Sequence, residues 1–128
     1  MTPHIIRLRG LWDYEVRSEA AGQSLRAGRA ELDTDWSTIL GNDLGARLRL
    51  LRRFGCPTGL QPTEQVVLAI KLEPIGAEAW MNDRSLGALS RDDAPARFLI
   101  HELLQPRNLL VLEVRKPPTI ADVWLEIG

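Results

Sequence analysis

The chain has 128 residues, of which 45 % are hydrophobic and 26 % are charged, a balance typical of one globular domain and not of a disordered segment. Its 16 lysines and arginines against 17 aspartates and glutamates give a formal net charge of −1, which offers no overall attraction to nucleic acid or to anionic membranes. Because Cys56 is the single cysteine, an intrachain disulfide and a cysteine-rich zinc site are both excluded.

The N-terminal segment, MTPHIIRLRG, carries charged residues where a signal peptide has its apolar core. No run of the chain approaches the roughly 18 apolar residues that a membrane-spanning helix needs. We therefore expect a single domain over residues 1–128 that is cytoplasmic and has no membrane segment.

Hydrophobic residues recur with period two, which indicates half-buried β-strands. The first such stretch is residues 4–17, with one face made of Ile6, Leu8, Trp12, Tyr14 and Val16. Two further stretches, residues 64–73 and 108–116, alternate in the same way. Shorter strands are predicted at residues 28–32, 46–54, 77–81, 96–100 and 123–127.

Helical periodicity is scarce, and the one helical turn that we predict lies at residues 101–104. The 8 prolines and 10 glycines fall mostly between the strands, as turn-forming residues do. Several short strands at this spacing indicate an all-β fold. We predict an antiparallel β-sandwich of the jelly-roll, galactose-binding-domain-like type, with at most one short helical turn.

The stretch WMNDRSLG, residues 80–87, predicts a β-hairpin. A two-residue type I′ turn needs a positive φ at both central residues, and Asn and Asp are the non-glycine residues that tolerate it best. Asn82 and Asp83 occupy these positions, Leu86 returns to the core, and Gly87 relieves the next bend. The stretch is therefore mainly a structural turn and not a binding site.

Five segments, in the same order along the chain, resemble the pattern of a known family. AEAWMNDRSLG (residues 77–87) resembles its hairpin a-V-W-L-N-G-x-x-L-G, and LRGLWDYEV (residues 8–16) resembles its opening strand L-x-G-x-W-x-F. The other segments, similar to its Y-R-R-x-F-x-x-P stretch, its F-x-I-T-x-L-L stretch and its closing strand, are residues 33–57, 98–114 and 121–127. This pattern belongs to the galactose-binding-like jelly-roll domain that opens the family 2 glycoside hydrolases, the β-galactosidase and β-glucuronidase group.

The resemblance implies a sugar-binding β-sandwich over nearly the whole chain. Arg52 and Phe54 match the family pattern, whereas the chain departs from it at Leu50, Leu51, Asp83 and His101. The catalytic carboxylates of those enzymes lie in a separate barrel domain, for which 128 residues leave no room. We therefore expect a protein that is not an enzyme.

The candidate ligand-binding residues are Trp80, Trp36 and Arg52. Trp80 alternates with Ala79 and Met81, so it points away from the core and could stack on a sugar ring. Trp36 follows a loop. For both tryptophans the alternative role is packing in the core or on a sheet surface, which is the commoner one for large aromatic side chains.

Arg52 shares the strand phase of Leu48 and Phe54, so its side chain is expected to point inward. A buried charge without a partner is costly. An internal ion pair is therefore favoured, with a partner among Asp13, Asp35 and Glu113. The alternative role is that of a guanidinium facing a ligand in a cleft.

The remaining polar patterns predict no further site. Arg47, Arg49 and Arg53 lie on one solvated strand face with no alternating aromatic residue, so no nucleic-acid partner is expected. Acidic turns at residues 33–35, 42–43 and 91–93 could supply oxygen ligands to a structural calcium ion, but their spacing matches no calcium loop, so neither a metal site nor a cofactor is predicted.

No catalytic residue is assigned, because neither His4 nor His101 accompanies a recognisable nucleophile. The sequence thus favours a non-catalytic binding module for carbohydrate or another small polar ligand. The alternative is a structural or protein-interaction domain that docks onto a partner or forms a homodimer without binding sugar.

Overall fold

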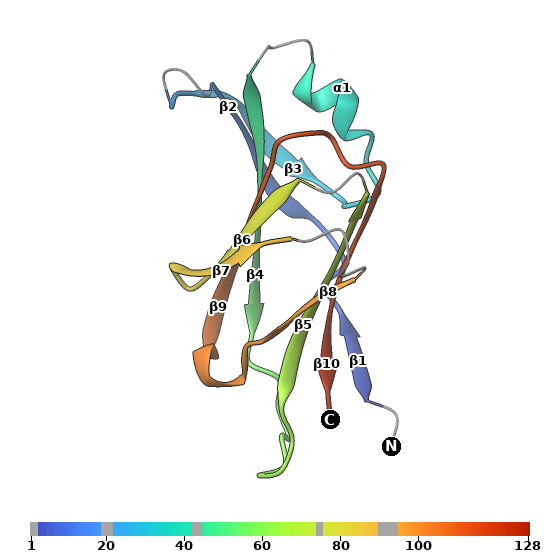
Figure 1. Cartoon of the computed structure of the whole chain (residues 1–128), viewed down its shortest axis with the longest axis vertical. Helices are drawn as coiled ribbons and strands as arrows, with labels where there is room; N and C mark the ends of the chain where they lie inside the picture. Colours follow the sequence, from blue (N-terminus) through green and yellow to red (C-terminus); the bar gives the residue numbers. More distant parts are fainter. Residues whose placement is uncertain (1–2, 19–21, 42–44, 74–75, 90–94) are drawn as a thin grey trace.

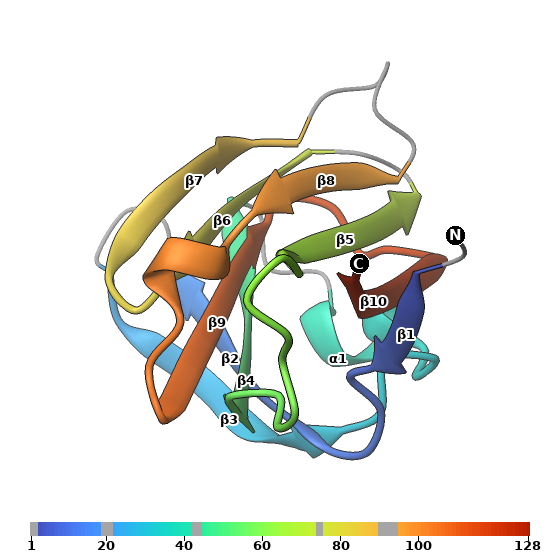
Figure 2. The same ribbon diagram turned by 90° about the horizontal axis from the view of Figure 1, so that it is seen from below.

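The computed structural model of the chain describes residues 3–18, 22–41, 45–73, 76–89 and 95–128. Two antiparallel sheets pack face to face and enclose one hydrophobic core (Figures 1 and 2). The prediction of an all-β antiparallel sandwich is confirmed. Within the described ranges, no helix is long and apolar enough to cross a membrane.

The two sheets differ in size, and all their neighbouring strands are antiparallel. The four-stranded sheet has the order β1 (His4–Arg7), β10 (Ile120–Ile127), β5 (Val66–Glu73) and β8 (Ala96–Leu99). The six-stranded sheet has the order β3 (Ser24–Ala30), β2 (Trp12–Ser18), β4 (Ala46–Gly55), β9 (Arg107–Val114), β6 (Ala77–Met81) and β7 (Arg84–Ala88). Strands β1 and β3 are therefore edge strands of different sheets.

The prediction of one continuous strand over residues 4–17 is wrong. Strand β1 ends at Arg7 and β2 begins at Trp12 in the other sheet, so the chain crosses between the sheets at residues 8–11. Gly10 has a φ of 86°, a left-handed conformation that glycine adopts without the steric cost of a Cβ atom. The alternation continues through this crossing because Leu8 still points into the core, where it is 4 % exposed.

The core is built from the inward-facing residues of both sheets. Leu48 and Leu50 on β4 and Leu110 and Leu112 on β9 are all 0 % exposed. The four-stranded sheet faces them with Val66, Leu68, Ile70, Val123 and Leu125. Fully burying a side chain of this size contributes about 1.5–3 kcal/mol, so the period-two pattern is also the main source of stability.

The predicted hairpin is confirmed. Strands β6 and β7 pair on either side of Asn82 and Asp83, whose φ angles of 51° and 67° are both positive. This is the backbone conformation that a type I′ turn requires. The stretch is a structural turn between two strands, as its sequence indicates.

The helical content exceeds the prediction of at most one short turn. The predicted turn is present as the 3₁₀ helix η1 (His101–Leu103), and a second short helix, α1 (Trp36–Leu40), was not predicted. Asp35 is the N-cap of helix α1, and its carboxylate accepts hydrogen bonds from the backbone N–H of Ser37 and from the hydroxyl groups of Ser37 and Thr38. These hydroxyl groups, with Ser37 the stronger contributor, hold the pKa of Asp35 below its ordinary value.

The C-terminal end of α1 is tied to the edge strand β3. Arg26 donates from Nη2 to the carbonyl oxygen of Leu40 at 2.8 Å and from Nε to that of Ile39 at 3.2 Å. An arginine at this end satisfies carbonyl groups that have no partner within the helix. Helix α1 is thereby held against the sandwich, with Trp36 and Leu40 buried beneath it.

Candidate functional site

A cavity of about 230 Å³ lies where the chain crosses from one sheet to the other. It is formed by the β1–β2 connection, the β3–α1 connection and the first residues of β10, on the side of the sandwich where the edge strands β1 and β3 lie (Figure 2). We call it the edge cavity. Its lining consists of Leu8, Arg9, Gly10, Glu31, Leu32, Asp33, Ala121 and Asp122.

Two tryptophans fix the connections that line the edge cavity. The indole Nε1 of Trp12 donates a hydrogen bond to the carbonyl oxygen of Leu8 at 3.0 Å, and that of Trp36 donates to the carbonyl oxygen of Leu32 at 2.9 Å. In each case the acceptor lies four residues before the tryptophan. Trp12 is 0 % and Trp36 is 1 % exposed, so both rings pack in the core while their N–H groups hold a lining loop.

Arg52 fixes the same β1–β2 connection. Its Nη2 donates to the carbonyl oxygen of Arg9 at 2.7 Å, and its Nη1 donates to the carbonyl oxygen of Arg53. The predicted ion pair with Asp13, Asp35 or Glu113 is wrong, because each of those carboxylates is bonded to other side chains. Backbone carbonyl groups replace the carboxylate because Arg52 lies near the end of β4, beside the chain crossing.

The charged side chains that line the edge cavity are mostly without internal partners. Among the described residues, none forms a hydrogen bond or ion pair with the side chains of Arg9, Glu31 and Asp33, and all three residues are exposed. Asp122, also in the lining, accepts a hydrogen bond from Arg7 at 2.5 Å. The cavity therefore presents one guanidinium and two carboxylates that are available to a ligand, on loops whose backbone is fixed from behind.

Trp80 lies elsewhere, on the outer face of the six-stranded sheet. It is half-buried and pairs across strands with Val111, which in turn pairs with Leu51. Strands β2, β4 and β9 separate β6 from β3, so Trp80 is remote from the edge cavity. The prediction that Trp80 points away from the core is confirmed, and its role in ligand binding stays a prediction.

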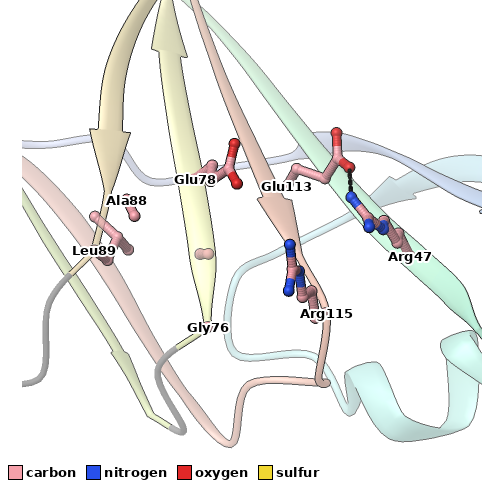
Figure 3. A pocket seen from close by; sticks show the side chains of 8 residues that line it. Arg47, Gly76, Glu78, Ala88, Leu89, Glu113 and Arg115 are labelled. Carbon is pink, nitrogen blue, oxygen red and sulfur yellow. Dashed lines mark hydrogen bonds and ion pairs between the residues drawn. The ribbon is translucent and has the colours of Figure 1, made fainter.

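The outer face that carries Trp80 also has two cavities similar in size to the edge cavity, of about 200 and 250 Å³, that share Arg47 and Glu113. Arg47 donates from Nη1 to Oε1 of Glu113 at 2.9 Å (Figure 3). Nη2 of Arg49 lies 3.8 Å from Oε2 of the same carboxylate. A third pair joins Arg17 and Glu15 at 3.3 Å. Arg47 and Arg49 on β4 thus pair with Glu113 on β9 across the strands, whereas Arg17 pairs with Glu15 along β2, and these pairs favour a role in sheet stability.

A metal centre has no support in the described residues. They contain no group of three or more His, Cys, Asp or Glu side chains placed to hold an ion. In the acidic turn at residues 33–35, Asp35 caps α1 and Asp33 lines the edge cavity. The other two acidic turns, residues 42–43 and 91–93, lie outside the described residues.

Of the three candidate residues from the sequence, Trp36 and Arg52 each donate a hydrogen bond to a loop that lines the edge cavity. Both hold its lining through backbone carbonyl groups, which strand periodicity does not predict. Arg9 and Glu31 were missed. Gly10 is the sequence feature that could have indicated Arg9. A glycine inside an alternating stretch marks a break or a bend in the strand, and residues beside such a break lie at the edge of a sheet.

Comparisons with known proteins agree with the fold. No family model matches the sequence, and no curated protein matches it. Among solved structures, the β-glucuronidase of Bifidobacterium dentium, complexed with coumarin-3-O-glucuronide, aligns over 89 % of this chain with a TM-score of 0.69 and 18 % identity. The β-D-glucuronidase of Dictyoglomus thermophilum aligns over 99 % of the chain with a TM-score of 0.69 and 12 % identity, and that of Ruminococcus gnavus over 98 % with 0.68 and 10 %.

The chain spans only a small part of these enzymes: 20 % of the Bifidobacterium chain, 28 % of the Dictyoglomus chain and 29 % of the Ruminococcus chain. It therefore corresponds to one domain of each and not to the whole enzyme. At 10–18 % identity the similarity establishes the fold. The chain has the β-sandwich fold of a domain found in β-glucuronidases and resembles the N-terminal domain of the family 2 glycoside hydrolases.

Proposed function

We propose that the chain is a non-catalytic binding module whose edge cavity holds one sugar unit or a polar ligand of similar size. The observation that carries this proposal is the set of free charged groups, Arg9, Glu31 and Asp33, around a cavity of about 230 Å³. Guanidinium and carboxylate groups donate and accept the hydrogen bonds that the hydroxyl groups of a sugar form. The cavity is smaller than the roughly 300–1,000 Å³ of sites for drug-sized ligands, which suits a single sugar ring.

The fixed backbone of the lining supports the same proposal. Trp12, Trp36 and Arg52 hold the two loops through hydrogen bonds of 2.7–3.0 Å, and the backbone N–H of Leu8 donates to the carbonyl oxygen of Val123 at 2.9 Å. A site on fixed loops loses less conformational entropy when a ligand binds. The fold adds to this, because its structural neighbours are domains of carbohydrate-processing enzymes, one of them in complex with a glucuronide.

Isothermal titration calorimetry with a panel of mono- and disaccharides tests the proposal. Arg9→Gln removes the guanidinium from the cavity, and because no described residue bonds to that side chain, the variant should fold normally while its affinity falls about tenfold or more. The matched control is Arg84→Gln, at an exposed arginine in β7 on the far side of the six-stranded sheet. The proposal is contradicted if no saccharide gives a heat of binding, or if Arg9→Gln and Arg84→Gln lose the same amount of affinity.

The absence of catalysis is a separate part of the proposal. It is supported by the small share of the hydrolase chains that this chain covers. Incubation with chromogenic glycosides should release no product above that from buffer. Turnover that copurifies with the chain and disappears in an Asp33→Asn or Glu31→Gln variant would contradict it.

The second candidate function, docking onto a partner or self-association, is favoured by one observation. On the outer face of the four-stranded sheet, Leu99 on β8 is 58 % exposed and Ile5 on β1 is 39 % exposed, and Val67 lies on the same cross-strand row. Exposed apolar residues on one face are typical of interaction surfaces. Sedimentation equilibrium distinguishes self-association from binding in a monomer: a dimer that Leu99→Gln dissociates would support this function.

A further inference from the structure

We propose that two copies of the chain associate through the free edge of strand β1, so that their four-stranded sheets join into one continuous antiparallel sheet. This inference goes beyond the proposed function and does not depend on ligand binding. It places self-association on a backbone edge and not on the apolar face around Leu99. The observation that carries it is the direction of the backbone groups of β1.

The hydrogen bonds between β1 and β10 show which backbone groups of β1 point outward. The backbone N–H of Leu8 donates to the carbonyl oxygen of Val123 at 2.9 Å, in register with the β1–β10 pairing. In an antiparallel pair, hydrogen-bonded and non-hydrogen-bonded positions alternate along the strand. Ile6 therefore bonds to β10. Ile5 and Arg7 direct their N–H and C=O groups to the other side, where β1 has no neighbouring strand among the described residues.

The opposite side of β10 agrees with this assignment. Gln65 and Gly128 exchange two backbone hydrogen bonds, of 3.0 and 3.1 Å, in register with the β5–β10 pairing. By the same alternation, Glu126 directs its N–H and C=O groups to β5. Glu126 lies opposite Ile5, so the backbone groups of Ile5 have no partner in β10.

One register of β1 against a second copy satisfies all of these outward groups. When Ile5 of each copy lies opposite Arg7 of the other, both pairs exchange N–H···O=C bonds. A shift by two residues in one direction places Arg7 opposite Pro3, which has no N–H, and a shift in the other direction places Arg7 opposite Arg7. A shift by one residue sets the core face of one sheet against the outer face of the other.

The side chains of β1 suit this register. Ile6 lies at the twofold axis, opposite Ile6 of the second copy, and it already packs partly buried against the core. Ile5, which is 39 % exposed, lies beside the aliphatic stem of Arg7 of the second copy. The guanidinium of Arg7 keeps its ion pair with Asp122 in its own copy. Two β-branched residues thus meet across the new strand pair without bringing like charges opposite each other.

The other edge strands are less suited to self-pairing. Strands β3 and β7 contain Gly28 and Gly87, and glycine weakens a strand. Strand β8 has the same backbone pattern as β1, because the N–H of Ile100 donates to the carbonyl oxygen of Val66 at 3.0 Å and Leu99 therefore directs its N–H outward. Strand β8 contains no β-branched residue, however, and so provides the matched control.

Sedimentation equilibrium of the chain without ligand tests the proposal. Because a pair of four-residue strands is a small interface, we expect a weak dimer, with a Kd of about 10–100 µM. Ile5→Pro removes an N–H that bonds to no other described residue, so the variant should fold, and its association should weaken by about tenfold or more. Leu99→Pro removes the equivalent N–H of β8 and should leave the association unchanged. The proposal is wrong if the parent is a monomer at about 1 mM, or if Ile5→Pro weakens the dimer no more than Leu99→Pro does.

Disulfide cross-linking tests the register. In a Cys56→Ser background, which removes the native thiol, Ile6→Cys places two thiols opposite each other with Cβ atoms about 4.5–5.5 Å apart, close to disulfide geometry. Mild oxidation should then give a covalent dimer. Ile5→Cys is the control, because its residue faces Arg7, and it should cross-link much more slowly. Faster cross-linking of Ile5→Cys would contradict the register.

Amide hydrogen exchange gives a test that needs no variant. Exchange at Ile5 and Arg7 should slow as the protein concentration rises, because both amides become hydrogen-bonded in the dimer. Exchange at Leu99, on the other free edge, should not depend on concentration. If the exchange of Ile5 and Arg7 is the same at all concentrations, the β1 edge is not the interface, whereas the proposed binding function is unaffected.

Discussion

The amide Nδ2 of Asn82, in the β6–β7 turn, donates a hydrogen bond to Oδ1 of the buried Asn108 on β9, 3.0 Å away. The same Nδ2 donates to the carbonyl oxygen of Leu103 at 3.0 Å, and Oδ1 of Asn82 accepts from the backbone N–H of Leu109 at 2.9 Å. Asn82 therefore combines the positive φ of the turn with three side-chain bonds that join the hairpin to η1 and β9. The β6–β7 turn therefore also connects the hairpin to the rest of the fold through polar side-chain contacts.

Replacement of Asn108 should be among the most destabilising single changes in the chain. Asn108 is 2 % exposed, its Nδ2 donates to the carbonyl oxygens of Phe54 and Gln105, and its Oδ1 accepts from the backbone N–H of Gln105. Asn108→Leu leaves these groups without partners and should lower the free energy of unfolding by about 2–4 kcal/mol, measured by urea denaturation. A loss below about 0.5 kcal/mol would show that the network is not structural.

The turn itself can be tested independently of that network. Asp83 has a φ of 67°, so Asp83→Gly should be neutral or stabilising, whereas Asp83→Ala should cost about 1 kcal/mol. Thermal unfolding of the two variants measures the difference. If alanine were tolerated as well as glycine, the left-handed conformation would not be a constraint at this position.

Much of the fold follows from period-two alternation and turn chemistry. The strand at residues 77–81 and the turn at Asn82 and Asp83 are where the sequence places them, because side-chain alternation and positive-φ residues are local signals. Helix α1 escapes prediction because five residues are too short to show helical periodicity, and the capping interactions of Asp35 and Arg26 stabilise it instead. The break between β1 and β2 at Gly10 is not predicted because the hydrophobic alternation continues through the residues that cross between the sheets.

Close packing between β2 and β3 predicts a steric coupling. A Cβ atom at Gly28 would lie 2.7 Å from Oη of Tyr14, whose ring packs edge-on against Trp36 with 5.8 Å between centroids. Gly28→Ala should therefore cost about 1–3 kcal/mol of stability, because the tyrosine has little freedom to move. In a double-mutant cycle, Tyr14→Leu should recover most of this cost, and purely additive effects would rule the contact out.

Trp36→Phe tests the supporting role of the indole N–H. The substitution keeps an aromatic ring in the core but leaves the carbonyl oxygen of Leu32 without its donor at 2.9 Å, so we expect a loss of about 1–2 kcal/mol in stability and weaker saccharide binding. Trp80→Phe is the matched control, since it changes a tryptophan remote from the edge cavity. If Trp80→Phe abolishes binding and Trp36→Phe does not, the ligand site lies on the outer face of the six-stranded sheet.

The candidate site was less accessible to sequence reasoning than the fold. Trp36 and Arg52 were identified as residues of interest, but their hydrogen bonds to Leu32 and Arg9 depend on where the loops run, which alternation does not specify. Arg9 and Glu31 become neighbours only because two edge strands of different sheets meet there. Such a meeting of segments from different sheets is visible only in the folded chain.

Stability should depend on pH through Glu126. The hydrogen bond from Arg97, at 3.0 Å, holds the pKa of Glu126 below its ordinary value of 4.5, and the indole of Trp124 contributes a second bond. Since the folded-state pKa is the lower one, the stabilisation is present above pH 4.5 and is lost as the pH falls through the folded-state pKa. Glu126→Gln should therefore be less stable than the parent at neutral pH and approach it at acid pH, measured by urea denaturation. A constant difference would contradict this linkage.

The most direct test of the binding function is a map of ligand contacts along the chain. ¹H–¹⁵N correlation spectra recorded during titration with the tightest-binding saccharide of the calorimetric panel should show saturable shifts confined to residues 8–10, 31–33 and 121–122, which line the edge cavity. Shifts centred on Trp80 and the strands around it, or no saturable shift at any residue, would contradict the account.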